Sequence, residues 1–286
     1  MAYQVKVLSL PKSDRSKHLL AQGTALGLEM SLCLGIDGNL IPDQSFNSFA
    51  PQKAAEFLLG RRIGKNELAC VLGHLNIYKD FVQNSLDEWC LVLEDDAKLE
   101  PKVMQFLELE SQFPRKSIIH LSPQNMDSEM RLKKKLLTSK ESCFEINKLL
   151  DFVPRTHAYL IDRQAAKIAI RNSRTNKFYF TADWPLSWIR KVDFWVTTEN
   201  LSDVLDLGSN IADERHAIEL ETTHQTLMKR ISRMRFVNWM INGFGFSSIY
   251  GRLIGIPANV TYRELFIIPF KARLLKSPLL KILLVK

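Results

Sequence analysis

A short apolar run, Trp89–Leu93, ends abruptly on three consecutive carboxylates, Glu94, Asp95 and Asp96. This junction constrains the fold more than any other feature of the sequence. A continuous apolar run of this length is typical of a strand buried on both faces of an α/β sheet. Ligands of open α/β sheets bind beyond the carboxyl ends of the strands. The sequence therefore predicts an α/β fold with a ligand site at the end of this strand.

The chemistry of the three acids suggests what that ligand is. Adjacent carboxylates resist ionising together unless a cation offsets their charge. Their oxygens suit Mg²⁺ or Mn²⁺, ions that usually also hold substrate phosphates. The alternative interpretation is a solvated acidic turn before a helix predicted over residues 101–113, because acids are favoured at helix starts.

Strand-like and helix-like patterns alternate through most of the chain. Strands are predicted over residues 3–10, 30–34, 117–121 and 158–161, and helices over 14–26, 52–59, 67–82, 101–113 and 163–171. Such alternation implies a mainly parallel sheet covered by helices. The polar segment 126–141, with Arg131 and Lys133–Lys135, is predicted to be a mobile insertion. It either closes over an anionic ligand or is a solvated surface loop.

Positive charge is concentrated at the C-terminus. The chain has a net charge of +8, yet residues 229–286 hold eleven Lys and Arg against one acid, leaving 28 basic and 30 acidic residues before them. We therefore divide the chain into a body, 1–228, and a basic helical extension, 229–286, rich in aromatic residues and Leu. The extension has no apolar run of about 18 residues and suits the interface of an anionic membrane. The alternatives are a subdomain packed on the body and a nucleic-acid surface, but the body is not basic and contains no nucleic-acid motif.

The cysteines and the N-terminus indicate the cellular compartment in which we expect the protein. Four scattered cysteines without a CxxC pair indicate neither a disulfide framework nor a zinc site. The N-terminus leads directly into the first predicted strand and shows no charged-then-apolar leader. We expect a reducing, cytoplasmic location.

The helix predicted over 67–82 carries a second pair of polar residues. Glu67 and His74 are seven residues apart, about two helical turns, so both can project from one face. Gly73 is unfavourable in a helix by about 1 kcal/mol relative to Ala, which makes sense if something approaches the backbone closely. The alternatives are an ordinary first-turn acid for Glu67 and a partly buried histidine for His74.

Several of these segments, in the same order, resemble glycosyltransferase family 25, the bacterial lipooligosaccharide glycosyltransferases related to collagen galactosyltransferases. The resemblance covers residues 3 to about 211 and is carried by Val7–Leu10 with Asp14-Arg15, Glu67–His74, Val92–Ala97, and Thr156–Ile161 with Ala165-Ala166. Asp183, before Trp184, stands where the family places another acid. The sequence departs from the family pattern at Asn66, Ala69 and Gly73, which replace Gly, Gly and Ser.

The resemblance implies a nucleotide-sugar transferase with a GT-A type fold that uses a divalent metal, Mn²⁺ or Mg²⁺. A metal can neutralise the charge that develops on a diphosphate leaving group as the glycosidic bond breaks. We expect Asp96 to bind the metal. Glu94 is expected on the metal or, like Asp95, on the ribose or a metal-bound water.

The remaining site residues follow from the same resemblance. Inversion needs a base that removes the acceptor hydroxyl's proton. Asp183 is the first candidate for this base and Glu67 the second, the alternative being that Asp183 caps a helix at Trp184. Arg15, His74 and Ser209 are predicted to contact the donor, although Arg15 can equally be a surface arginine.

We therefore expect an inverting transferase that moves a hexose, galactose from UDP-galactose, onto a lipooligosaccharide acceptor. It would act at the cytoplasmic face of the inner membrane, held peripherally by its basic extension, with no nucleic-acid partner. One alternative is a non-catalytic membrane-recruited binding protein on a degenerate transferase scaffold. Another is a metal-dependent phosphohydrolase, but the sequence lacks the second dense cluster of His and Asp ligands of two-metal enzymes.

Overall fold

The computed structural model describes residues 3–11, 13–53, 55, 62–123, 131–149, 156–173, 191–208, 211, 213–215 and 218. The chain forms two compact units. The first comprises Met1–Ile36, Leu72–Asn172 and Trp188–Gly208, and the second comprises Asp37–Val71, Ser173–Ser187 and Ser209–Lys286. The predicted boundary near residue 228 and the basic extension after it lie outside the described residues.

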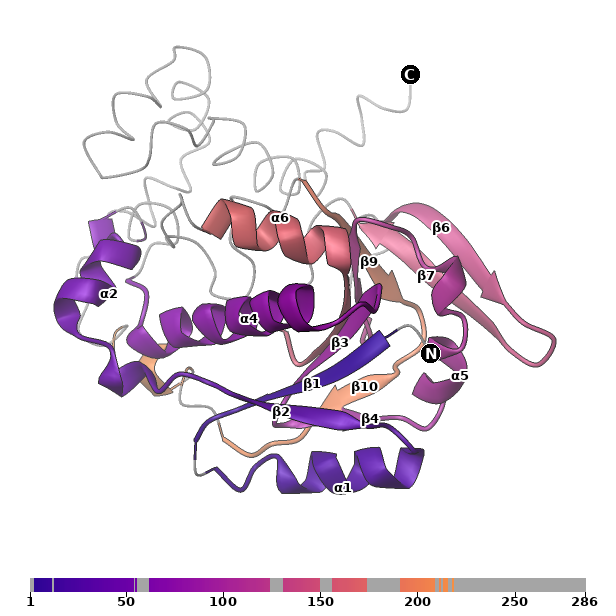
Figure 1. The fold of residues 1–286 in the computed structure, drawn as a ribbon, viewed down its shortest axis with the longest axis horizontal. Coiled ribbons are helices and arrows are strands. Elements are labelled where there is room, and N and C mark those ends of the chain that lie inside the picture. The colour runs from indigo at the N-terminus through magenta and orange to yellow at the C-terminus, as the bar shows by residue number, and fades with distance from the viewer. Residues whose placement is uncertain are drawn as a thin grey trace, which may run out of the picture. The chain divides into compact units, whose positions relative to one another are not determined.

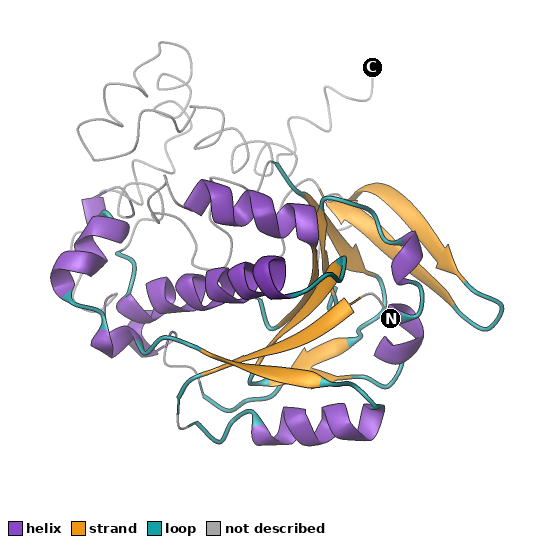
Figure 2. Ribbon diagram, in the orientation of Figure 1, coloured by secondary structure: helices purple, strands orange, loops and turns teal. Residues whose placement is uncertain are grey.

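An eight-stranded sheet forms the centre of the first unit, in the order β2-β1-β3-β8-β5-β9-β7-β6 (Figure 1). Its strands are β1 (Tyr3–Ser9), β2 (Met30–Leu34), β3 (Trp89–Glu94), β5 (Ser117–His120), β6 (Arg131–Thr138), β7 (Cys143–Leu149), β8 (Ala158–Asp162) and β9 (Asp193–Thr197). A small second sheet pairs β4 (Ala97–Leu99) with β10 (Ser202–Val204). The predicted α/β class, with helices covering a sheet, is confirmed (Figure 2).

The prediction of a mainly parallel sheet is wrong. Strand β1 is parallel to both β2 and β3, and β5 is parallel to β9. Strand β8, however, is antiparallel to both β3 and β5, and β7 is antiparallel to β6 and β9. A short strand buried on both faces has the same apolar pattern in either direction, so its sequence does not reveal how it runs.

Most of the helices fall close to predicted positions: α1 (Lys17–Leu26), α4 (Lys65–Asn84), α5 (Val103–Leu107) and α6 (Arg163–Ser173). Helix α2 (Asp43–Phe49) was not predicted, and 3₁₀ turns lie at Gly38–Leu40 and Glu110–Gln112. The helix predicted over 101–113 is thus α5 followed by a separate turn, and much of the helix predicted over 52–59 lies outside the described residues. Within the described part of the chain, no helix combines the length and apolar character needed to cross a bilayer.

The two faces of the sheet differ because side chains alternate along each strand. On one face, odd-numbered residues of β1 and β3 join a buried apolar cluster with side chains from α1 and α5: Val5, Val7, Leu19, Trp89, Leu91, Leu93 and Phe106. The other face meets α4. A Cβ on Gly73 would lie 3.0 Å from Leu8 Cδ1, which confirms the predicted close approach at this glycine. The side chain of Glu94, even-numbered like Leu8, points to the α4 face.

The prediction that segment 126–141 is a mobile insertion is wrong for residues 131–138. These residues form β6, which pairs antiparallel with β7 through most of its length. Lys133 and Lys134 are exposed, and Lys134 forms an ion pair with Glu145 on β7. Lysines are common on edge strands because they oppose pairing with another chain. The charge that suggested a loop therefore belongs to the last strand of the sheet.

Arg163, the first residue of α6, connects that helix to the end of α4. Its guanidinium donates to the carbonyl oxygens of Asp87, Val82 and Ser85 at 2.8, 3.1 and 2.7 Å. It also lies 4.8 Å from the centroid of the Phe81 ring. The last carbonyls of a helix have no partner within the helix, so this side chain satisfies the Val82 carbonyl that α4 leaves open, together with two carbonyls of the segment that follows.

We predict that Arg163→Met lowers the free energy of unfolding by about 2 kcal/mol, because the carbonyls it serves lose a charged donor. Urea denaturation measures the change. Arg171→Met, an exposed arginine on the same helix, is the control and should change stability little. Equal stabilities of the two variants would contradict this role of Arg163.

Candidate functional site

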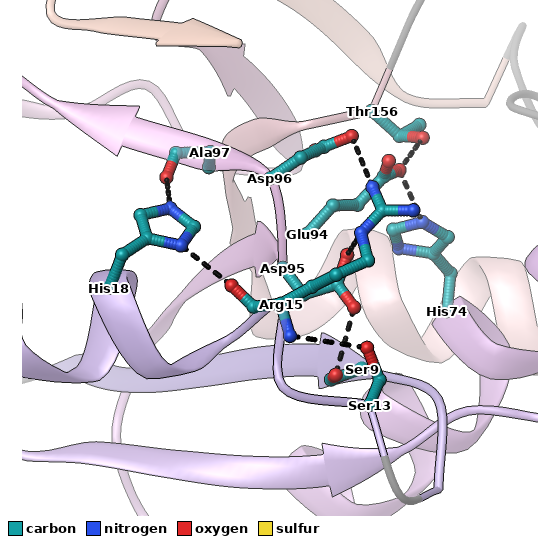
Figure 3. Close-up of polar contacts among 10 residues, drawn as sticks. All are labelled: Ser9, Ser13, Arg15, His18, His74, Glu94, Asp95, Asp96, Ala97 and Thr156. Carbon is teal, nitrogen blue, oxygen red and sulfur yellow. Dashed lines mark hydrogen bonds and ion pairs between the residues drawn. The ribbon is translucent and has the colours of Figure 1, made fainter. Parts of the chain in front are cut away.

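The three acids lie at the carboxyl end of β3, where the ends of neighbouring strands meet. Strands β1 and β3 are parallel, with Leu8 opposite Glu94, so their carboxyl ends lie side by side. Strand β8 runs the other way, with Ala158 opposite Leu93, so its first residues reach the same place. The polar residues just past these ends come together as Figure 3 shows.

Glu94 is held by side chains from α4 and from the segment before β8. Its Oε1 lies 3.1 Å from His74 Nε2 and accepts a hydrogen bond from Thr156 Oγ1. Burial raises the pKa of Glu94. The contacts with His74 and Thr156 lower the pKa by more than burial raises it, so it lies below its usual value. Glu94 is thus a partly buried, ionised carboxylate, and the structure brings it into contact with His74, another predicted site residue.

Asp95 and Asp96 share one cation, Arg15 (Figure 3). Arg15 Nε lies 3.2 Å from Asp95 Oδ1, and Arg15 Nη2 donates to Asp96 Oδ2 at 3.0 Å. Asp95 also accepts a hydrogen bond of 2.8 Å from Ser9 Oγ at the end of β1. The arginine is therefore part of the acidic cluster and not an isolated surface residue, whereas its contact with the donor stays a prediction.

His18 fixes the segment that carries Arg15. Its Nδ1 lies 2.6 Å from the Arg15 carbonyl oxygen, and its Nε2 lies 3.1 Å from the carbonyl oxygen of Ala97, the first residue of β4. The start of α1 is thus connected to the strand that follows the acids. This contact restricts where the Arg15 guanidinium can lie.

One oxygen of the cluster has no hydrogen-bond partner within the described part of the chain. This is Asp96 Oδ1, which is buried. Burial, together with repulsion from Glu94 and Asp95, outweighs the attraction of Arg15 and raises the pKa of Asp96 to about 6. Negative charge at Asp96 is thus incompletely offset, and a carboxylate oxygen there remains available to a cation. The two predicted metal ligands differ in their surroundings. Glu94 shares a group with His74 and Cys70, whose possible ligand atoms lie within 4.8 Å of one another, whereas Asp96 offers an oxygen without a hydrogen-bond partner.

Glu67 belongs to the second unit, where its carboxylate is fully engaged. Its Oε2 accepts from the Gly64 backbone N–H at 3.0 Å, and its Oε1 lies 2.8 and 2.7 Å from Arg215 Nε and Nη2. Its side chain is 1% exposed. The neighbouring Glu214 accepts from the backbone N–H of Lys65 and Asn66 at 2.8 and 2.9 Å. Glu67 thus secures the start of α4 to residues 214–215, a contact that proton abstraction would have to break.

The site also contains residues that the sequence did not single out as site residues: Ser9, His18, Thr156 and Tyr159. Thr156 and Tyr159 lie within the family-like segment but carried no assigned role. Ser9 ends the strand before Arg15, a position next to the acids only if β1 and β3 are neighbours. Asp183 and Ser209 lie outside the described residues.

Comparison with known families identifies the chain. The model of glycosyltransferase family 25, described as an LPS biosynthesis protein, matches residues 3–183. The chain belongs to glycosyltransferase family 25. The match includes the whole described acidic site, with Arg15, His74 and Glu94–Asp96.

Two solved structures are similar at low level. One is a glycosyltransferase involved in glycosylation of the major capsid of PBCV-1, 13% identical, with a TM-score of 0.30, covering 61% of this chain and 66% of its own. The other is the inositol-1-phosphate CTP transferase from T. maritima, 13% identical, with a TM-score of 0.33, covering 77% and 96%. The chain thus spans slightly less than two thirds of the viral enzyme. No curated protein matches the chain.

The raised pKa of Asp96 generates a pH-dependent prediction. An unfolded aspartate has a pKa of about 3.9, whereas Asp96 in the folded protein has one of about 6. The folded state therefore binds this proton more tightly, and its stabilising effect is complete below the unfolded pKa and lost as pH rises through the folded one. Relative to Asp96→Asn, the wild type should lose about 2 kcal/mol of stability between pH 4 and 7 in metal-free buffer. Urea denaturation across this range tests it, and a pH-independent difference would contradict it.

Proposed function

We propose that this family 25 chain is an inverting glycosyltransferase that moves a hexose, galactose from UDP-galactose, onto a lipooligosaccharide acceptor. The observation that carries the proposal is the acidic cluster at the end of β3, with Arg15 against it. A nucleotide sugar brings a diphosphate, whose charge both a carboxylate-held cation and an arginine can match.

We further propose that Mn²⁺ or Mg²⁺ binds at Asp96, with Glu94 beside it. The buried, unpartnered Asp96 Oδ1 and the raised pKa of this residue support the proposal, because both indicate negative charge that the protein leaves partly unbalanced. When bound, the ion would offset charge on the leaving diphosphate. Arg15, which contacts Asp95 and Asp96, would contact a phosphate of the donor, because the guanidinium fork matches phosphate geometry as well as carboxylate geometry.

The acceptor hydroxyl must lose its proton as it attacks the anomeric carbon. We assign this step to Asp183, with Glu67 as the second candidate, as the family resemblance implies. The engagement of both Glu67 oxygens by Gly64 and Arg215 favours Asp183. Ser209 is proposed to contact the donor.

Asp96→Asn should reduce transfer of galactose from UDP-galactose by about 100-fold or more, because it removes the charge that holds the ion. Excess EDTA should reduce wild-type activity to a similar level, and Mn²⁺ should restore it. Asp203→Asn, at an exposed aspartate on β10, is the matched control and should retain activity.

Full activity of Asp96→Asn, or of the wild type in EDTA, would overturn the metal assignment. A wild type that binds UDP with Mn²⁺ but transfers sugar to no acceptor would favour the alternative of a binding protein on a transferase scaffold. Release of phosphate without sugar transfer would favour a phosphohydrolase.

We also propose that the basic extension, residues 229–286, holds the enzyme against the cytoplasmic face of the inner membrane, where the acceptor's lipid is embedded. The charge difference between the extension and the near-neutral body supports this proposal. Each basic residue close to an anionic surface contributes on the order of 1 kcal/mol.

Changing five cations of the extension to Gln, at Lys271, Arg273, Lys276, Lys281 and Lys286, should weaken binding to phosphatidylserine vesicles by more than about 100-fold. The control changes five exposed cations of the body to Gln, at Lys17, Lys79, Lys98, Lys102 and Lys167, which alters net charge equally. Vesicle co-sedimentation measures both. Equal weakening by the two sets would rule out a specific role of the extension.

A further inference from the structure

A chain of buried hydrogen bonds leads from the inner face of α4 to Glu94. The hydroxyl oxygens of Tyr78 and Tyr159 are 2.6 Å apart, and Tyr159 Oη lies 2.8 Å from His74 Nδ1. On the other side of the imidazole ring, His74 Nε2 lies 3.1 Å from Glu94 Oε1. Tyr78, Tyr159 and His74 are each at most 2% exposed. The first three groups of the chain therefore lie where water does not reach, and the chain ends at Glu94, whose side chain is 27% exposed.

Register explains why these groups meet. Tyr159 on β8 lies opposite Val92 on β3, and Val92 is two residues before Glu94 on the same face of the sheet. That face meets α4, which carries His74 and Tyr78 one turn apart. Gly73, with Leu8 packed against it, allows the helix to lie close enough for the contact.

The chemistry of the groups determines which one donates at each step. Glu94 Oε1 accepts from Thr156 Oγ1, and its contact with His74 Nε2 is a hydrogen bond when that nitrogen carries the proton and donates. In the Nε2–H tautomer of a neutral imidazole, Nδ1 is the acceptor, and the Tyr159 hydroxyl donates to it across the 2.8 Å contact. Burial raises the pKa of Tyr159 well above its usual value, so this hydroxyl keeps its proton. Tyr78 in turn donates to the Tyr159 oxygen.

We propose that Tyr159 is a positioning residue for donor binding: its hydroxyl fixes the tautomer and ring orientation of His74, and His74 thereby holds Glu94. This inference rests on the proposed function only in giving Glu94 a nucleotide sugar to contact. Without the hydroxyl, His74 is free to carry its proton on Nδ1. Nε2 would then present a lone pair to the Glu94 carboxylate, and the two groups would repel each other.

Tyr78 provides a matched control, because it is similarly buried and its hydroxyl joins the same chain one step further from the imidazole, 2.6 Å from Tyr159 Oη. Tyr159→Phe removes the donor to His74, whereas Tyr78→Phe leaves it. We expect ¹⁵N NMR of the imidazole to show the Nε2–H tautomer in the wild type and in Tyr78→Phe, and a mixture of tautomers in Tyr159→Phe. This NMR measurement uses the full-length protein without substrate and does not require catalysis.

The kinetic test uses UDP-galactose with Mn²⁺. Tyr159→Phe should raise KM for the donor about 10-fold with a smaller change in kcat, and Tyr78→Phe should change KM less than about twofold. In a Glu94→Gln background, Tyr159→Phe should add little further loss, because both changes act on one interaction. A purely structural role would instead give independent, additive effects.

The results distinguish a failure of the proposal for Tyr159 from a failure of the proposed function. An unchanged tautomer in Tyr159→Phe, equal effects of the two tyrosine variants, or additive losses with Glu94→Gln would overturn the proposal for Tyr159. If the tautomer changes as expected but the wild type turns over no nucleotide sugar, the proposed function fails while the effect of Tyr159 on His74 stands.

Discussion

The structure of the site depends on balancing three successive carboxylates at the end of one buried strand. Adjacent acids at the edge of a low-dielectric core are unfavourable unless each finds compensation. Glu94 points to the α4 face and is matched by His74, whereas Asp95 and Asp96 share the guanidinium of Arg15. The compensating groups thus come from separate parts of the first unit. The positions of α1, α4 and the strand ends are thereby linked to one electrostatic requirement.

That balance is incomplete at Asp96, and the incompleteness is what the proposed function uses. A fully paired cluster would offer nothing to a ligand, whereas a fully unpaired one would oppose folding. Here Asp96 keeps one buried oxygen open while Arg15 occupies the other. The same arginine that stabilises the two aspartates is suited to a phosphate. Membership of glycosyltransferase family 25 makes a sugar diphosphate the natural ligand to propose for this arrangement.

Local sequence patterns predicted much of the fold, and tertiary context decided the rest. The strand at 30–34 is found with the predicted bounds, and the helix predicted at 67–82 lies within α4. The lysine-rich residues 131–138 form an edge strand and not the predicted loop, because the polar sequence of a strand that faces water resembles that of a loop. The site could likewise be predicted only in part. Its acids and Arg15 lie in recognisable motifs, but Ser9 contacts Asp95 across 86 residues of chain. Only the pairing of β1 with β3 brings those two together.

The central claim is that a divalent ion at Asp96 and the diphosphate of a nucleotide sugar meet at the end of β3. A crystal structure of the full chain soaked with UDP and Mn²⁺ tests it most directly, because anomalous scattering locates manganese without ambiguity. The account predicts an anomalous peak in contact with Asp96 Oδ1 and phosphate density beside Arg15. Manganese or UDP bound elsewhere, with Arg15 still closed on Asp95 and Asp96, would contradict it.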